Sequence, residues 1–360
     1  MGVFFDYISN LPDDVIERIL LVLPIIDVVR MSVLSKKWRF KWASLPQLVF
    51  DKQCFAHPSK VQTILIEQLV KNIDRVLLLH TGPIQRFKLS HKDLLWVPEI
   101  DGWILHLSRI KVEEVVINIW KGGMYKLPSH LFSCQHLNHL ELYNCTFTLP
   151  RTLRGFVLLQ TLDLQYFTVT DDILENVISN CPLLKRLILK YFHNSELKIN
   201  ARKLCFLELE ARDIAQEDQL VVSVGLKCLS LDVNFTSTED ILAAIGILRR
   251  MPNLQELKLQ ARYTAEESIV ESIIDVFKGL DNLNCSLNHL QHIEINGISG
   301  IKTELEVIEI LLARAMVLKK MTINLSKGIK GSGMYRELLR FRRASSEAEI
   351  LLGATEFLTD

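Results

Sequence analysis

Two pairs of histidines come closest, by type and spacing, to a metal site in this chain. His136 and His139 are three positions apart, and so are His289 and His292. Each pair straddles the first position of an expected β-strand, where side chains three apart point to opposite faces. Two ligands on one strand would need a spacing of two. The pairs therefore do not predict a metal site.

Three closely spaced glycines, Gly328, Gly331 and Gly333, invite comparison with a phosphate-binding loop. No lysine follows the last of them and no strand motif precedes them, so the segment predicts a flexible connection. The Gly-x-Ser-x-Gly, His-Glu-x-x-His and Cys-Gly nucleophile signatures are also missing from the sequence. We therefore expect neither catalytic activity nor a bound cofactor or metal.

Charge and cysteine content narrow the class of protein. Forty-two Lys and Arg residues balance 42 Asp and Glu residues, so no net charge attracts nucleic acid or an anionic membrane. The most apolar run, from Ile19 to Ile26, is interrupted by Pro24 and is far shorter than the roughly 20 apolar residues that span a bilayer. Seven cysteines without a Cys-x-x-Cys pair indicate reduced thiols. We expect a protein of the nucleus or cytoplasm with no nucleic-acid or membrane partner.

A short apolar template recurs along most of the chain. Its form is apolar-x-x-apolar-x-apolar, and ten copies occur at intervals of 20 to 36 residues. The copies begin at Ile84, Val112, Leu137, Leu159, Leu184, Leu204, Leu226, Leu254, Leu290 and Leu318. Most of the intervals fall within or near the 20–29-residue period of leucine-rich repeats.

Strand geometry explains the template. Because side chains alternate along a strand, the last two apolar residues of each copy point inward and the residues between them point outward. One copy alone cannot bury its apolar face, so the copies must stack into a parallel sheet. Helices that return the chain are expected from Asp171, from Thr238 and over Ala265 to Lys278. An ordinary doubly wound α/β domain also alternates strands and helices, but it does not account for the repeated six-residue register.

The first fifty residues form a different unit, which reads as three short helices. The first would begin at Pro12 and end at Pro24, and the third would be capped by Ser35. The apolar residues that these helices would carry are Val15, Ile16, Ile19, Leu20, Leu23, Val28, Val29, Val33, Trp38 and Trp42. So few residues cannot bury all of these side chains among themselves. Either a partner protein covers them or they cap the repeat array, and both alternatives are open on physical grounds.

The same segment resembles the F-box of plant F-box/leucine-rich-repeat proteins. The similarity runs from Leu11-Pro12 through Leu23-Pro24 and Ser35-Lys36-Lys37-Trp38-Arg39 to Leu45-Pro46 and Phe50-Asp51. In that family the F-box helices bind a Skp-type adaptor, which in turn holds a cullin scaffold and its RING subunit. The resemblance implies that the adaptor contacts are Leu11, Pro12, Ile16, Ile19, Leu20, Leu23, Pro24, Val28, Leu34, Ser35 and Trp38.

The C-terminal end resembles the FBD domain that closes many members of this family. The similarity covers Leu290 to Ile298, Glu304 to Ile323 and Glu337 to Ser345. It implies two further strands with a helix between them, followed by a terminal helix that carries Leu338, Leu339 and Phe341. The expected fold class is therefore α/β. It comprises a three-helix F-box (1–51), a helical linker (52–83), a leucine-rich-repeat solenoid with a curved parallel sheet and helices on its convex side (84–282), and an FBD-type αβ unit (283–360).

Outward residues of the repeat strands would line a concave face on which a target protein can bind. Apolar and aromatic residues exposed on a polar strip are candidate hot spots. The most distinctive patch combines Tyr143, Arg186, Ile188, Lys190, Phe206 and Glu208. Alternatively, Arg186 and Lys190 pair with Glu208 and Glu210 across adjacent strands and serve stability alone.

Together these features predict the substrate-recognition subunit of an SCF-type ubiquitin ligase. The F-box would bind the Skp-type adaptor of a cullin-RING ligase, and the repeats would hold an unidentified protein target close to the transfer chemistry. Two alternatives are open. One is an F-box protein that binds the adaptor without delivering a target for degradation, and the other is a repeat scaffold whose N-terminal helices are only a cap.

Overall fold

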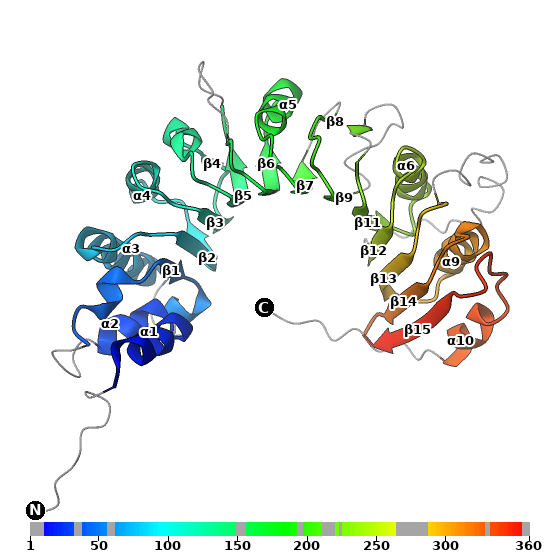
Figure 1. Cartoon of the computed structure of the whole chain (residues 1–360), viewed down its shortest axis with the longest axis horizontal. Helices are drawn as coiled ribbons and strands as arrows, with labels where there is room; N and C mark the ends of the chain where they lie inside the picture. The colour runs from blue at the N-terminus through cyan, green and yellow to red at the C-terminus, as the bar shows by residue number, and fades with distance from the viewer. Residues whose placement is uncertain are drawn as a thin grey trace, which may run out of the picture. The chain divides into compact units, whose positions relative to one another are not determined.

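The computed structural model in Figure 1 describes residues 11–31, 38–55, 62–148, 156–192, 197–210, 220–222, 225–263, 287–327 and 332–354. The chain divides into two compact units, Met1–Val169 and Thr170–Asp360. In each unit, helices lie along one side of a row of strands (Figure 1).

The N-terminal unit opens with two short helices. Asp13 and Asp14 occupy the first turn of the first helix, where negative charge is favoured, and Pro12 precedes them. Lys41 binds Asp13 at 3.0 Å and so ties this helix to a later 3₁₀ turn. The elements are α1 (Asp13–Val22), α2 (Ile25–Met31), the 3₁₀ helix η1 (Lys41–Ser44), β1 (Gln47–Phe50), η2 (Lys52–Phe55), α3 (Gln62–Leu79), β2 (Arg86–Leu95), α4 (Glu99–Ser108), β3 (Glu114–Lys121), β4 (Tyr125–Lys126), η3 (Ser129–Ser133), β5 (His139–Thr146) and β6 (Thr161–Thr168).

Parallel pairing joins the strands of this unit in the order β1-β2-β3-β5-β6, with β4 attached to β5. The template positions align across the strands. Phe87 lies opposite Val115, which lies opposite Leu140, which in turn lies opposite Leu162. The inward side chains therefore form continuous ladders.

The C-terminal unit repeats the same architecture. Its strands pair in parallel in the order β7-β9-β11-β12-β13-β14-β15, and β8 pairs separately with β10. The elements are α5 (Asp171–Ser179), β7 (Arg186–Phe192), β8 (Leu197–Ile199), β9 (Phe206–Glu210), β10 (Leu220–Val222), β11 (Cys228–Asn234), α6 (Thr238–Arg249), β12 (Glu256–Arg262), β13 (His292–Ile298), α9 (Lys302–Arg314), β14 (Lys320–Leu325), α10 (Ser332–Leu338) and β15 (Glu349–Ala354).

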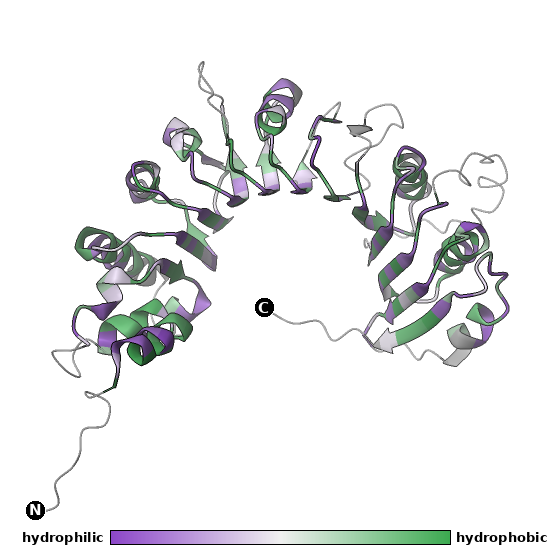
Figure 2. Cartoon of the chain, viewed as in Figure 1, coloured by the Kyte–Doolittle hydropathy of each residue, from purple (hydrophilic) through white to green (hydrophobic). Residues whose placement is uncertain are grey.

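The template residues make the cores of both units. All ten residues that begin a copy of the template are at most 3 % exposed, and each copy ends in a strand of the parallel sheets. Figure 2 shows the resulting alternation of polar and apolar bands along the strands. Because full burial of one such side chain contributes roughly 1.5–3 kcal/mol, the ladders dominate the stability of each unit. The ten predicted strands are confirmed.

Several predicted elements differ at the chain ends. The expected third N-terminal helix begins in residues that the structure does not describe, and Trp38 to Phe40 form a turn before η1. Two strands at the chain ends were not predicted, β1 inside the expected helical segment and β15 after the expected terminal helix, and neither were the short strands β4, β8 and β10 between the repeats. That helix, α10, ends at Leu338, so Leu339 and Phe341 follow it instead of lying on it.

The expected connecting helices are confirmed where the structure describes them. α5 begins at Asp171 as predicted, and the linker contains α3. α6 begins at Thr238, although its cap is the preceding Ser237, whose hydroxyl accepts the Asp240 N–H at 3.2 Å. The helix predicted from Ala265 to Lys278, together with Gly328 and Gly331, lies outside the described residues. None of the described helices combines the length and apolar character that crossing a bilayer demands.

Glu304 organises the start of α9 within the FBD-like segment. Its side chain is fully buried and accepts N–H groups from Gly300 at 2.7 Å and Ile301 at 3.0 Å, as well as the hydroxyl of Tyr263. Burial raises the pKa of this carboxyl group, against the opposing effect of these hydrogen bonds. The carboxylate satisfies amides that would otherwise be orphaned at the helix start.

The Glu304→Gln substitution is expected to lower the free energy of unfolding by about 1–2 kcal/mol, because an amide group cannot accept from all of these donors. Urea unfolding of the full chain measures the effect. Glu309→Gln, on the same helix but partly exposed, should change stability by less than about 0.5 kcal/mol. Equal effects of the two substitutions would contradict this role for Glu304.

Candidate interaction surfaces

The N-terminal helices bury part of the set predicted to contact an adaptor. Ile16, Leu20, Val28 and Trp38 are at most 2 % exposed and belong to the core of the unit. Leu11, Ile19, Leu23 and Pro24 are partly exposed and Pro12 is exposed, whereas Leu34 and Ser35 lie outside the described residues. The four buried residues therefore shape the unit and do not present a surface to a partner in this conformation.

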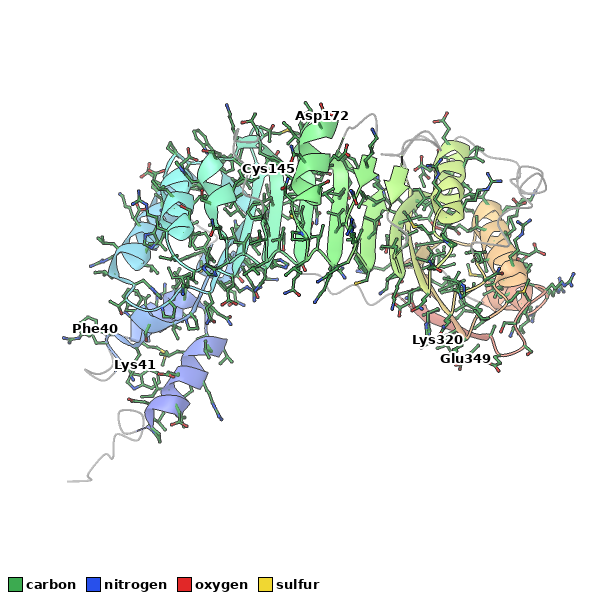
Figure 3. The ribbon with its side chains drawn as sticks, turned by 45° about the horizontal axis from the view of Figure 1, so that its top comes forward. Phe40, Lys41, Cys145, Asp172, Lys320 and Glu349 are labelled. Carbon is green, nitrogen blue, oxygen red and sulfur yellow. The ribbon has the colours of Figure 1, made fainter. Side chains whose placement is uncertain are left out.

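Other apolar side chains of this unit do reach solvent. Val22 is 81 % exposed at the end of α1, Leu21 is 47 % exposed, and Phe40 is 73 % exposed in the turn before η1. Phe40 projects away from the ribbon in Figure 3. Sequence reasoning missed these residues. A signal was present, because the run from Ile19 to Leu23 is apolar on every side and one helix face cannot bury it.

A cleft of about 520 Å³ opens beside Phe40. Its floor contains Trp42 and Phe50, and Arg30, Arg39 and Arg75 lie around it. The described lining includes no carboxylate, although Arg30 binds the nearby Asp27 at 3.1 Å. The remaining lining residues are Ile25, Ile26, Val29, Asn72, Val76 and Leu79. An apolar floor with a basic rim fits an apolar side chain flanked by acidic residues.

On the polar face of the C-terminal sheet, the predicted patch is a network of internal pairs. Lys190 binds Glu208 at 2.6 Å and Asp232 at 3.2 Å, and Arg186 approaches Glu208 at 3.7 Å. Burial by itself would lower the pKa of Lys190, but the carboxylates of Asp232 and Glu208 outweigh it and raise the pKa. Cross-strand pairing, one of the two alternatives raised by the sequence, thus describes this network.

Three further observations concern the predicted patch and its neighbour Glu210. Ile188 is only 9 % exposed, so it is not an open hot spot. The guanidinium group of Arg186 covers Phe206 at 3.5 Å from the ring centroid. Glu210 pairs with Arg262, which lies two strands away on the same face.

In the N-terminal unit, Tyr143 belongs to a row of three aromatic rings. Its ring stacks on Trp120 at 4.1 Å with an interplanar angle of 26°, and it packs on Tyr166 at 4.9 Å. The flanking rings of Trp120 and Tyr166 are 47 % and 42 % exposed. The sequence template identified Tyr143 but not its two neighbours, which lie beyond the six-residue register.

The histidines and cysteines that the sequence drew attention to lie as follows. His136 is exposed before β5, and His139 is partly exposed at the first position of that strand. No group of three or more His, Cys, Asp or Glu side chains in the described ranges is placed to hold a metal ion. Burial raises the pKa of the Cys134 and Cys145 thiols to about 12 (Figure 3 labels Cys145), which keeps them neutral at physiological pH.

Three known families match successive parts of the chain. The F-box domain matches residues 8–49, the leucine-rich repeats of an FBD-associated F-box protein (At5g56370) match residues 100–224, and FBD matches residues 283–323. The parallel sheets, their polar faces and the N-terminal helices thus define a protein-interaction adaptor built on repeats.

Relatives in Arabidopsis thaliana extend the match to the whole chain. The F-box/FBD/LRR-repeat protein At1g13570 is 34 % identical over 98 % of this chain and 99 % of its own length. An F-box/LRR-repeat protein, At4g15060, is 30 % identical over 75 % of this chain and 66 % of its own length. The chain belongs to the F-box/FBD/LRR-repeat family of plant proteins.

Proposed function

We propose that this chain is the substrate-recognition subunit of an SCF-type ubiquitin ligase. Its N-terminal unit would bind a Skp-type adaptor, and through it a cullin-RING ligase, while the polar faces of the repeats would hold a protein target. The observation that carries the proposal is the exposure of the apolar side chains of Val22 and Phe40, the second of which lines the basic cleft, within the segment that matches the F-box. The proposed limits of the parts remain 1–51, 52–83, 84–282 and 283–360.

The proposed adaptor surface differs from the predicted one. It keeps the partly exposed Leu23 and Pro24 and adds Leu21, Val22 and Phe40. Phe40, with the arginines of the cleft around it, has the composition of an interface centre and rim. A cap on the repeats would need no basic cleft open to solvent, so the cleft favours a partner over capping.

Reconstitution tests the proposal. The full chain is mixed with a Skp-type adaptor, a cullin and its RING subunit, and the complex is separated by size-exclusion chromatography. Co-elution of all four proteins is expected. Failure of the adaptor to bind would reject the proposal, whereas adaptor binding without accumulation of any protein after depletion of this chain in cells would favour the non-degradative alternative.

Charge reversal at the cleft gives a specific prediction. Arg75→Glu is expected to weaken adaptor binding by about 10-fold, because it places a negative charge where an acidic partner segment would lie. Surface plasmon resonance measures the affinity. Lys111→Glu makes the same change in net charge at an exposed position outside the cleft and should leave the affinity unchanged. Equal losses of adaptor affinity in the two variants would mean that binding depends only on the net charge of the chain.

A further inference from the structure

The aromatic row Trp120–Tyr143–Tyr166 crosses three neighbouring strands of the N-terminal sheet. Asn118 on β3 lies opposite Tyr143 on β5, and Tyr143 lies opposite Gln165 on β6. Strict alternation after Gln165 would turn Tyr166 toward the core. Its backbone is instead left-handed, with φ +50°, and the ring stays 42 % exposed beside Tyr143. The corresponding residues of two other repeats, Asn144 and Tyr191, are also left-handed, so this conformation is a recurrent feature of the repeat and at Tyr166 keeps the ring on the polar face.

Two carboxylates lie on the same face, one outward position before the row. Glu141 precedes Tyr143 by two residues, about 7 Å along the strand, and is directly opposite Asp163. Like charges in this relation repel each other. The contact with His139 and the hydrogen bond from Asn118 nevertheless hold the pKa of Glu141 below its usual range. The face therefore presents the partly exposed carboxylate of Glu141 near the exposed rings, while Asp163 beside it is only 9 % exposed and accepts the Gln165 amide at 3.0 Å.

The C-terminal unit contains the same combination with an arginine already in place. The guanidinium group of Arg186 lies 3.5 Å from the centroid of Phe206 and 3.7 Å from the carboxylate of Glu208. Arg262 likewise lies 5.5 Å from the Tyr191 ring and pairs with Glu210. In this fold, an aromatic ring beside a carboxylate on the polar sheet face thus forms a binding site for a guanidinium group. The guanidinium can stack on the ring and pair with the carboxylate at the same time.

We propose that the aromatic row, with Glu141 and Asp163 beside it, binds an arginine side chain of a partner protein. This deepens the target-binding half of the proposed function and rests on it only for the identity of the partner as the target. Stacking on Trp120 or Tyr166 supplies the cation–π contact, and the paired carboxylates supply the counter-charge. A lysine would gain less, because its ammonium group cannot stack as a plane.

Fluorescence anisotropy of labelled peptides tests the site in the full chain. The probes are six repeats of Arg-Gly, of Lys-Gly and of citrulline-Gly, the last of which keeps the planar group without its charge. The Arg-Gly peptide is expected to bind most tightly and the citrulline peptide most weakly. Trp120→Ala combined with Tyr166→Asn should weaken binding of the Arg-Gly peptide by about 5- to 20-fold. Asparagine is chosen because it tolerates the left-handed backbone.

Controls separate this site from general effects. Trp96→Ala removes another tryptophan of the same unit, 47 % exposed and stacked on Tyr125, and should leave peptide binding unchanged. Glu141→Gln should weaken binding without altering the fold. Adaptor affinity is measured on the wild type and on the same variants. If the wild type does not bind the adaptor, the ligase proposal is rejected, but the arginine site is not. Equal affinity for the arginine and citrulline peptides, or unchanged binding by the double variant, would overturn the arginine site.

Discussion

The full chain carrying Val22→Asp and Phe40→Asp should lose at least about 100-fold in affinity for a Skp-type adaptor, since each central interface residue contributes on the order of 2 kcal/mol or more. Both side chains are more than 70 % exposed, at 81 % and 73 %, so neither supports the core. The aspartates would place desolvated charge in an apolar contact, which is costly. Isothermal titration calorimetry gives the affinity directly.

The matched control for this pair is Leu78→Asp. Leu78 is 83 % exposed on α3 of the same unit and does not line the basic cleft. The Leu78→Asp variant should bind the adaptor with wild-type affinity. Circular dichroism should show the same melting curve for all variants. Substitution of Leu20 would not be a clean test, because that side chain is 2 % exposed and its loss would disturb the fold. Wild-type affinity in the double variant would show that the adaptor binds elsewhere.

Lys190→Met is expected to destabilise the C-terminal unit by about 2–4 kcal/mol, because the mostly buried carboxylates of Glu208 and Asp232 would remain without their cation. The three side chains are 17 %, 18 % and 7 % exposed, and the lysine binds both carboxylates within 3.2 Å. Urea unfolding followed by fluorescence measures the change. Lys258→Met, which breaks the more exposed pair with Glu294, should cost less than about 1 kcal/mol.

The pH dependence of stability in the wild type follows from the raised pKa of Lys190. A lysine whose folded pKa is raised stabilises the protein at every pH below its unfolded value and loses that contribution as the pH rises through the folded value. The wild type therefore keeps the contribution throughout the neutral range. In Lys190→Met the cost arises largely from ionised Asp232, whose pKa is raised by burial. The stability difference from the wild type should therefore narrow on acidification, as the pH falls through this raised pKa and Asp232 protonates. A constant difference from pH 4 to pH 8 would contradict an electrostatic origin.

The repeat strands could be predicted because the spacing of their apolar residues marks the strand register. Buried leucines at three fixed positions define a strand wherever they recur, as at Leu137, Leu140 and Leu142. The same template fits Leu45, Leu48 and Phe50, the last two of which lie in β1, but their resemblance to the end of an F-box assigned them to the helical segment. β15 lacks the first template position, which is occupied by Glu347, so no pattern marked it.

The surfaces were harder to predict than the core. Whether Leu20 or Val22 faces solvent depends on how α1 packs against the rest of its unit, and both residues are apolar in sequence. The arginine that covers Phe206 and the left-handed turn that exposes Tyr166 arise from tertiary packing. Outward positions are therefore predictable as a set, but their partners are not.

Hydrogen exchange of the full chain, with and without a Skp-type adaptor, tests the central claim most directly. The adaptor should slow exchange at the end of α1, in the turn at 38–40 and in the part of α3 that lines the basic cleft, and leave β11 to β14 unchanged. The account would be contradicted if bound adaptor left those N-terminal amides exchanging as they do in the free chain.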